Sequence, residues 1–105
     1  MDTYRRPALE ALADPRRRSI FELLGDGPLS VVEIAQNVPI SRPAVSQHLK
    51  TLKDAGLVTV QAVGTRRIYG LDPTGVAAAR DYFDWFWTTA LAAYAQAAST
   101  TKEEQ

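Results

Sequence analysis

The chain has 105 residues, and its 12 basic and 12 acidic side chains give a formal net charge of zero. This length fits one modest core, so we expect a single domain over residues 1–105. The absence of cysteine excludes disulfide bonds and thiolate metal sites. The start of the chain has no apolar export signal and no stretch is long enough to span a membrane, so the sequence predicts a cytoplasmic protein without a membrane partner.

Charge is unevenly distributed along the chain. Residues 42–67 contain five basic side chains and one acidic one, whereas residues 72–105 contain five acidic side chains and two basic ones. A local basic excess attracts phosphate groups, and the neutral total limits indiscriminate coating of nucleic acid. The pattern favours salt-sensitive, base-dependent binding of nucleic acid by residues 42–67.

Two short helices are predicted at the start of the chain. The first covers residues 7–13 with Leu9 and Leu12 directed inward, and Asp14-Pro15 ends it and begins the second. The buried set of the second helix is Ile20, Phe21, Leu23 and Leu24. Two glycines and a proline in residues 25–28 stop this helix.

Three consecutive arginines, Arg16 to Arg18, lie in the first turn of the second helix, where the helix dipole disfavours cations. A compensating interaction is therefore expected. One interpretation is ion pairing with Asp14, Glu10 or Glu22, and we favour it because charge runs on helices usually face water. The other is a clamp on a phosphate group, and the sequence leaves both open.

A helix-turn-helix is predicted over residues 30–55. Ser30 and Glu33 form a capping box at the start of its first helix, and Pro39 prevents this helix from continuing. The chain restarts at Ser41 in a second helix. Two helices joined by so short a turn are typical of this motif.

The second of these helices has an inward and an outward face. At about 100° per residue, Val45, Leu49 and Leu52 form a narrow apolar stripe that we expect in the core. The outward face is polar and rich in hydrogen-bonding groups, which suits the major groove of duplex DNA. Its predicted DNA-contacting residues are Ser41, Arg42, Pro43, Ser46, Gln47 and Lys50.

A β-hairpin is predicted over residues 57–71, because two β-branched or alternating runs flank a Gly-Thr pair. After a DNA-reading helix such a hairpin is called a wing. Thr65, Arg66 and Arg67 at its tip, with Lys53 of the preceding helix, are expected to contact the DNA backbone or the minor groove. The alternative is a hairpin that is merely solvated.

The last predicted helix covers residues 73–98 and is about 40 Å long at 1.5 Å per residue. Its large rings exceed what so small a domain can cover, so we expect a second copy to meet it across a two-fold axis. The first and last helices form this predicted homodimer interface, with residues Leu9, Leu12, Tyr82, Phe83, Phe86, Trp87, Leu91 and Tyr94. The polar tail, residues 99–105, is expected to be flexible.

Catalytic and metal-binding groups are sparse. His48 is the only histidine, and Ser46, two positions away on the same helix, faces another direction, so the pair is no catalytic dyad. We interpret His48 as a packing residue that flanks the buried stripe. Asp81 and Asp84 lack a third ligand. The sequence predicts a protein that is not an enzyme and binds neither a metal nor a cofactor.

Four segments resemble the ArsR/SmtB family of bacterial winged-helix repressors, and the similarity extends from about Ala8 to the start of the last helix. They are Leu12-Ala-Asp-Pro-Arg-Arg-Arg18, Leu29-Ser-Val-Val-Glu-Ile-Ala35, residues 41–58 and Gly64-Thr-Arg-Arg-Ile-Tyr-Gly-Leu71. The resemblance implies a mainly α-helical winged helix-turn-helix fold with a small β-hairpin, in the order four helices, two strands and a fifth helix. It also implies a homodimer and DNA reading.

The familiar metal sites of this family are missing from the sequence. Relatives that sense metals commonly carry cysteines in the segment that matches residues 29–33, or an Asp/His set on the last helix. Here the cysteine positions are Ser30 and Val32, and the last helix has no histidine. The small-molecule effector is therefore unknown, and a hydrophobic pocket lined by Trp85 or Trp87 is a hypothesis only.

Taken with the resemblance, these features predict a dimeric, sequence-specific transcriptional repressor of an inverted repeat, which includes repression of its own gene as one option. Its partners are double-stranded DNA and a second copy of itself. Gln47 is expected to read adenine, Arg42 guanine or phosphate, and Lys50, Arg66 and Arg67 phosphate. A winged helix that docks proteins or associates with RNA is the alternative, since the fold alone does not settle function.

Overall fold

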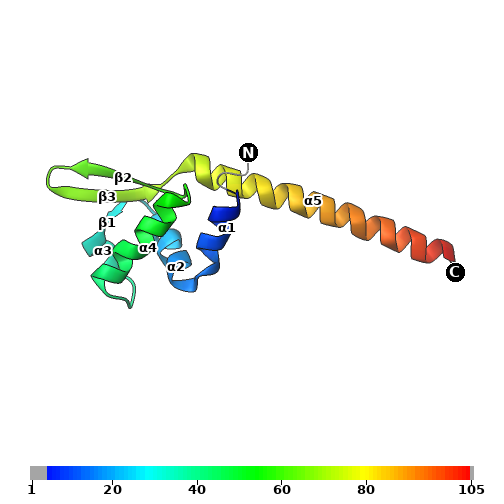
Figure 1. Ribbon diagram of the computed structural model, residues 1–105, viewed down its shortest axis with the longest axis horizontal. Helices are drawn as coiled ribbons and strands as arrows, with labels where there is room; N and C mark the ends of the chain where they lie inside the picture. Colours follow the sequence, from blue (N-terminus) through cyan, green and yellow to red (C-terminus); the bar gives the residue numbers. More distant parts are fainter. Residues whose placement is uncertain (1–4, 105) are drawn as a thin grey trace.

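A computed structural model describes the backbone of residues 5–104 and the side chains of residues 6–99. Within that part of the chain, five helices and three strands form a mainly helical fold with a small antiparallel sheet, as predicted (Figure 1). The helices are α1 (Arg5–Ala13), α2 (Pro15–Leu24), α3 (Val31–Ala35), α4 (Arg42–Asp54) and α5 (Pro73–Glu104). The strands are β1 (Leu29–Ser30), β2 (Val58–Val63) and β3 (Arg66–Leu71).

The helix starts follow the capping signals of the sequence. Asp14 Oδ1 accepts the backbone N–H groups of Arg16 and Arg17 at 2.8 and 3.2 Å, which satisfies the first turn of α2. At α3, Ser30 Oγ accepts from the Glu33 N–H at 3.3 Å while Glu33 Oε1 accepts from the Ser30 N–H at 2.9 Å. The predicted capping box is thus confirmed, although α3 has only five residues.

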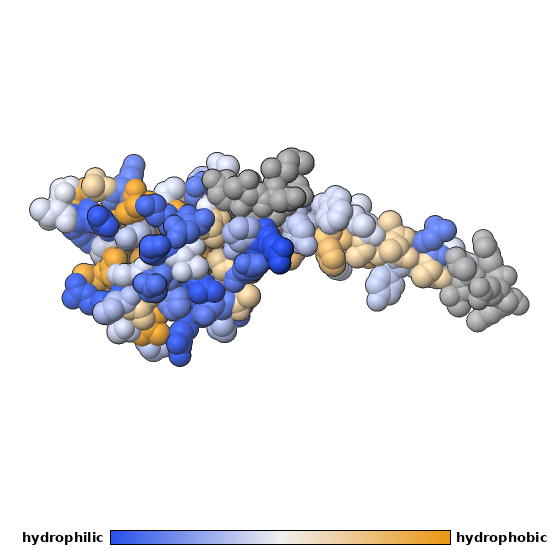
Figure 2. Space-filling view, in the orientation of Figure 1, coloured by the Kyte–Doolittle hydropathy of each residue, from blue (hydrophilic) through white to orange (hydrophobic). Residues whose placement is uncertain are grey.

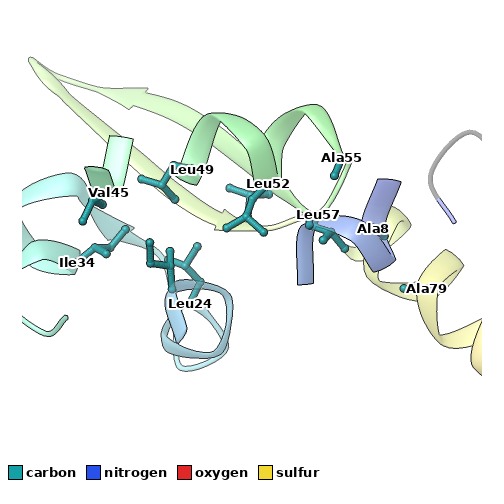
Figure 3. Packing of buried hydrophobic residues seen from close by; sticks show 12 residues of the cluster. Ala8, Leu24, Ile34, Val45, Leu49, Leu52, Ala55, Leu57 and Ala79 are labelled. Atoms are coloured by element: carbon teal, nitrogen blue, oxygen red, sulfur yellow. The ribbon is translucent and has the colours of Figure 1, made fainter. Parts of the chain in front are cut away.

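The core is built around α4. Val45, Leu49 and Leu52 are fully buried, as their spacing predicted, and Leu49 and Leu52 lie at the centre of the cluster in Figure 3. The other buried apolar side chains come from the other four helices, from the turn after α4 and from the start of β2: Ala8, Ala11, Ile20, Leu24, Ile34, Ala55, Leu57, Val58 and Ala79. The helix-turn-helix is therefore held by the core on its inner side.

The predicted inner face of the first helix is only partly confirmed. Ala8 and Ala11 are the buried residues of α1, whereas Leu9 and Leu12 are partly buried, and Leu12 packs against the core from its margin. Small side chains let α1 lie close to α2 and α5, since the distance between helix axes depends on the residues at the contact. Leu9 therefore keeps apolar surface at the edge of the domain.

In α2, the predicted buried set is confirmed at Ile20 and Leu24, which are 0% and 2% exposed. Phe21 and Leu23 are only partly buried, at the margin of the core. The helix thus buries a narrower stripe than its apolar run indicates.

The sheet contains one strand more than predicted. Its strand order is β1-β3-β2, and β1 pairs Leu29 with Tyr69 and Ser30 with Ile68. Two residues are too few to produce a recognisable alternation, so no pattern in the sequence predicts β1. The hairpin of β2 and β3 is confirmed, and its two-residue turn contains Gly64 with φ 63°.

Helix α5 gives the molecule its elongated shape (Figure 1). At 32 residues it is about 48 Å long, and the molecule measures 68 × 28 × 20 Å. The radius of gyration is 18.4 Å, whereas a compact chain of this size has roughly 13 Å. Only the first turns of α5 pack on the domain, through Gly75 and Ala79. The rest of the helix projects away from it.

The end of α5 corrects the sequence prediction. The helix continues to Glu104, beyond the end expected near residue 98, so residues 99–104 of the predicted flexible tail are helical. No glycine or proline follows Gly75 in the chain, so nothing in the sequence stops the helix. Among the described residues, no helix combines the length and hydropathy that a membrane crossing requires.

Candidate nucleic-acid interface

The outer face of α4 presents the predicted DNA-contacting residues. Ser41 caps the helix by accepting the N–H of Ala44 at 3.3 Å, and Pro43 follows within the first turn. All six predicted residues of this face are exposed: Ser41, Arg42, Pro43, Ser46, Gln47 and Lys50. The structure therefore leaves a continuous polar face on a helix whose opposite side is fixed in the core.

A groove separates this face from the sheet. Ser46, Gln47, Lys50 and Lys53 of α4 line one side of it, and Arg67 of the wing lines the other. Apolar side chains complete the lining: Val31, Val60 and Tyr69. Five of the predicted contact residues, from two elements, thus converge on one concave surface.

Lys50 forms an ion pair within α4. Its Nζ lies 3.1 Å from Asp54 Oδ2, four residues later, and both side chains are largely exposed. Exposed pairs of this kind contribute little to stability, on the order of 0.3–0.5 kcal/mol. Lys50 can therefore leave Asp54 for a phosphate group at little cost to the stability of the fold.

The two wing arginines have different surroundings, although the sequence places them together at the tip. Successive strand residues point to opposite faces. Arg67 lines the groove beside α4, whereas Arg66 Nη2 lies 3.0 Å from both Ser30 Oγ and Glu33 Oε1. These partners are 36 and 33 positions away in the chain, so no local pattern reveals the contact.

The Glu33 carboxylate is stabilised in its charged form. The backbone N–H of Ser30 and then the Ser30 hydroxyl hold the pKa of Glu33 below its ordinary value, and the Arg66 guanidinium acts in the same direction. Glu33 therefore stays ionised at neutral pH. Its carboxylate caps the start of α3 and at the same time accepts a hydrogen bond from Arg66 of the wing.

Two of the three arginines in α2 form hydrogen bonds to the backbone of α1. Arg17 Nε donates to the Ala11 carbonyl at 2.8 Å, and Arg18 Nη1 donates to the Leu12 carbonyl at 3.0 Å. Both acceptors lie in the last turn of α1, where carbonyl groups lack helical partners. Arg17 also lies 3.9 Å from Asp14, which agrees with the ion pairing expected. Arg16 is exposed.

The projecting part of α5 carries uncovered aromatic side chains, as predicted. Six large apolar residues of this segment are 49–80% exposed: Phe83, Trp85, Phe86, Trp87, Leu91 and Tyr94. Figure 2 shows hydrophobic residues along the helix beyond the domain. Tyr82 is half-buried, with the rings of Phe83, Trp85 and Phe86 at 5.9–6.4 Å. Rings from one helix cannot cover one another fully.

The exposed aromatic side chains fall mostly on one side of α5. At about 100° per residue, Phe83, Phe86 and Tyr94 lie within roughly 60° of Ala79, which is buried against the domain. Trp85 lies about 120° away. The apolar face that packs on the domain thus continues past its edge, where the side chains of residues 6–99 leave it uncovered.

His48 belongs to no metal-binding cluster among the side chains that the structure describes. His48 is partly buried beside the inner stripe of α4, in agreement with a packing role. Across the described residues, His, Cys, Asp and Glu side chains form no group of three or more able to hold a metal ion.

Comparisons with known proteins agree with this geometry. A helix-turn-helix domain family matches residues 12–61. The HTH-type transcriptional regulator Rv2034 of Mycobacterium tuberculosis is 60% identical over 98 residues, 91% of this chain and 92% of that protein. A crystal structure described as a "Possible transcriptional regulator for arsenical resistance" is 44% identical with a TM-score of 0.70, and the match covers 83% of this chain and 85% of that one.

A solution structure from Mycobacterium bovis extends the comparison. It is the homodimeric winged helix-turn-helix DNA-binding domain of Mb0332, a possible ArsR-family transcriptional regulator. It is 32% identical to this chain with a TM-score of 0.65, and the match covers 81% of this chain and 76% of that one.

The helix-turn-helix with its exposed polar helix and basic wing, together with these relatives, identifies the chain as a DNA-binding transcriptional regulator. The similarity in sequence and fold extends through the wing into α5. This chain belongs to the ArsR family of winged helix-turn-helix transcriptional regulators.

Proposed function

We propose that this regulator is a homodimeric repressor that binds an inverted repeat through α4 and the wing. The observation that carries the proposal is the convergence of Gln47, Lys50 and Arg67 on one groove beside an exposed polar helix face. When the dimer binds an inverted repeat within a promoter, it excludes other proteins from that DNA. The regulator acts by binding, without a catalytic step, a metal or a cofactor, in the cytoplasm where its DNA partner lies.

Base reading falls to the first turns of α4. The Gln47 amide has the donor and acceptor that pair with adenine, and Ser46 beside it can donate to or accept from a base edge. Arg42 reaches guanine or phosphate, while Ser41 and Pro43 allow the N-terminal turn to approach the duplex. Lys50, Lys53, Thr65 and Arg67 contact the DNA backbone and set affinity and register.

Dimerisation is supported by the uncovered apolar face of α5. Phe83, Phe86 and Tyr94 need a partner of matching chemistry, and a second copy supplies one across a two-fold axis. Leu9 at the edge of α1 keeps apolar surface that can join this interface. The homodimeric Mycobacterium bovis relative has the same fold. Two α4 helices in such a dimer read half-sites one helical turn or a multiple apart.

A mobility shift tests the proposal. The protein is titrated with the DNA upstream of its own gene at two salt concentrations, with an unrelated duplex as competitor. We expect the upstream DNA to bind more tightly, by a factor that persists at the higher salt while both affinities fall. Equal affinity for the two duplexes would contradict a sequence-specific repressor.

A further inference from the structure

Arg66 connects the wing to the start of the helix-turn-helix. Its Nη2 bridges Ser30 Oγ and Glu33 Oε1 at 3.0 Å each. These same two atoms accept the backbone N–H groups of Glu33 and Ser30 in the capping box of α3. The guanidinium therefore contacts a rigid, hydrogen-bonded corner of the fold.

The contact occurs where the sheet loses its third strand. The pair of Ser30 with Ile68 is the last between β1 and β3, and from Arg67 outward β3 pairs with β2 alone. A two-stranded hairpin is marginally ordered by itself. Arg66 lies beyond the end of β1, and its side chain connects this outer part of the hairpin to Ser30 and Glu33.

We propose that Arg66 and Glu33 are positioning residues for DNA binding, whose contact holds the outer wing at a fixed place beside α4. Arg67 then meets the DNA backbone while Gln47 lies in the major groove. The inference rests on the proposed DNA-binding face. It assigns Arg66 a role different from that of Arg67, although the two are adjacent in sequence.

The pair is accessible enough for an alternative to be tested. The side chains of Arg66 and Glu33 are 58% and 43% exposed, so a DNA phosphate can reach Arg66 and compete with Glu33 for it. The two roles give opposite results at Glu33. Removing its negative charge strengthens DNA binding if only electrostatics matters, and weakens it if the carboxylate positions the wing.

Four variants separate the roles: Arg66→Ala, Glu33→Gln, the double variant, and Arg67→Ala as the matched control. Glutamine retains the capping box, so Glu33→Gln keeps α3 while it removes the charged partner of Arg66. Each variant is titrated with the upstream DNA across a salt series. Thermal unfolding of each variant confirms that the domain is folded.

Positioning predicts a specific pattern of affinities. Arg66→Ala weakens binding about three- to tenfold with the salt slope unchanged, and Glu33→Gln weakens it in the same direction. The double variant loses no more than Arg66→Ala, because both changes remove one contact. Arg67→Ala lowers the salt slope by about one unit. A slope reduced equally by Arg66→Ala, or tighter binding by Glu33→Gln, overturns the inference.

Hydrogen exchange without DNA tests the contact independently of function. We expect faster exchange of the wing amides 63–67 in Arg66→Ala and in Glu33→Gln, and wild-type exchange in Arg67→Ala. Unchanged exchange in the first two variants overturns the inference even if DNA binding is specific. If wild-type protein shows no preference for the upstream DNA, the proposed function fails while the exchange result still decides the role of Arg66.

Discussion

Gly75 at the start of α5 lies directly against Gly56 at the end of α4. A Cβ atom on Gly75 would stand 1.6 Å from the Gly56 carbonyl oxygen. Gly56 has φ 79° and ends α4, and the N–H of Leu57 returns to the Leu52 carbonyl at 3.0 Å. The Asp72 N–H donates to the Leu57 carbonyl at 2.9 Å. The helix proposed for DNA reading and the helix proposed for dimerisation are thus joined by backbone contact.

Gly75→Ala should therefore displace α5 from α4. We expect a loss of about 1–3 kcal/mol in the free energy of unfolding, since a methyl group has no space at this contact. Gly70→Ala is the matched control, because a Cβ there meets Pro28 at an ordinary 3.5 Å. Thermal denaturation at fixed protein concentration measures both. An equal effect of the two substitutions would refute the close contact.

Arg17→Ala should destabilise the fold without involving DNA. The variant removes a hydrogen bond to the Ala11 carbonyl from a side chain that is 22% exposed, and we expect a loss of about 1–2 kcal/mol. Arg16→Ala removes an exposed arginine of the same turn and should change stability by less than about 0.5 kcal/mol. Denaturant titration compares them. Equal losses of unfolding free energy in the two variants would mean that the hydrogen bond from Arg17 to the Ala11 carbonyl does not stabilise the fold.

Gln47→Ala should change base preference rather than general affinity. Loss of the amide is expected to cost about 1–3 kcal/mol at particular base pairs and to leave the salt slope as it is. Lys50→Ala is the matched control one turn later on the same face, and it should weaken all sequences about equally. Competition with single-base operator variants measures both. A uniform loss for Gln47→Ala would remove it from base reading.

Acid should destabilise the protein through its two capping carboxylates. Backbone hydrogen bonds, from Arg17 to Asp14 and from Ser30 to Glu33, lower both pKa values from their ordinary 3.8 and 4.5. Groups with lowered pKa values stabilise the fold above the unfolded-state pKa, and this stability is lost as the pH falls through the folded-state pKa. The thermal midpoint should be steady above about pH 5.5 and decline below about pH 4.5.

Asp14→Asn and Glu33→Gln are the controls for this pH dependence, because each amide keeps an acceptor at the cap but does not titrate. The decline below about pH 4.5 should be shallower in each variant than in the wild-type protein. A decline of unchanged steepness in both variants would assign the acid sensitivity to other groups.

The sequence predicted features that depend on neighbouring residues. The stripe of Val45, Leu49 and Leu52 follows helical periodicity, and the capping box of Ser30 and Glu33 follows local hydrogen bonding, so both were visible in the chain. The wing turn was equally local, because it needs a glycine at positive φ.

Features set by distant contacts could not be predicted in the same way. Which face of α1 is buried depends on how closely α2 and α5 approach. Their close approach buries the small Ala8 and Ala11 more completely than the larger leucines. Arg66 contacts Ser30 and Glu33, which lie more than thirty positions away in the chain. From the sequence alone, it is therefore assigned the same role as its neighbour Arg67. The end of α5 was placed too early because polar residues after Ala98 suggested a tail, although this segment also contains lysine and glutamate, which are residue types of high helix propensity.

Phe86→Asp should separate the proposed dimer and leave the domain folded. Phe86 is 51% exposed and lies on the uncovered face of α5, so a charge there opposes burial against a second copy. Trp85→Asp is the control, because Trp85 lies on another side of the helix. Size-exclusion chromatography with light scattering at micromolar concentration should give half the wild-type mass for Phe86→Asp alone. Dissociation by both substitutions would show that the interface is not confined to this face.

Sedimentation of the wild-type protein, alone and with a duplex that carries its inverted repeat, decides whether the regulator is a homodimer in solution and on DNA. A homodimer has twice the chain mass of 11.5 kDa when free at micromolar concentration, and places two chains on each duplex. A single chain in solution that also occupies the duplex one copy at a time would contradict the proposed homodimer.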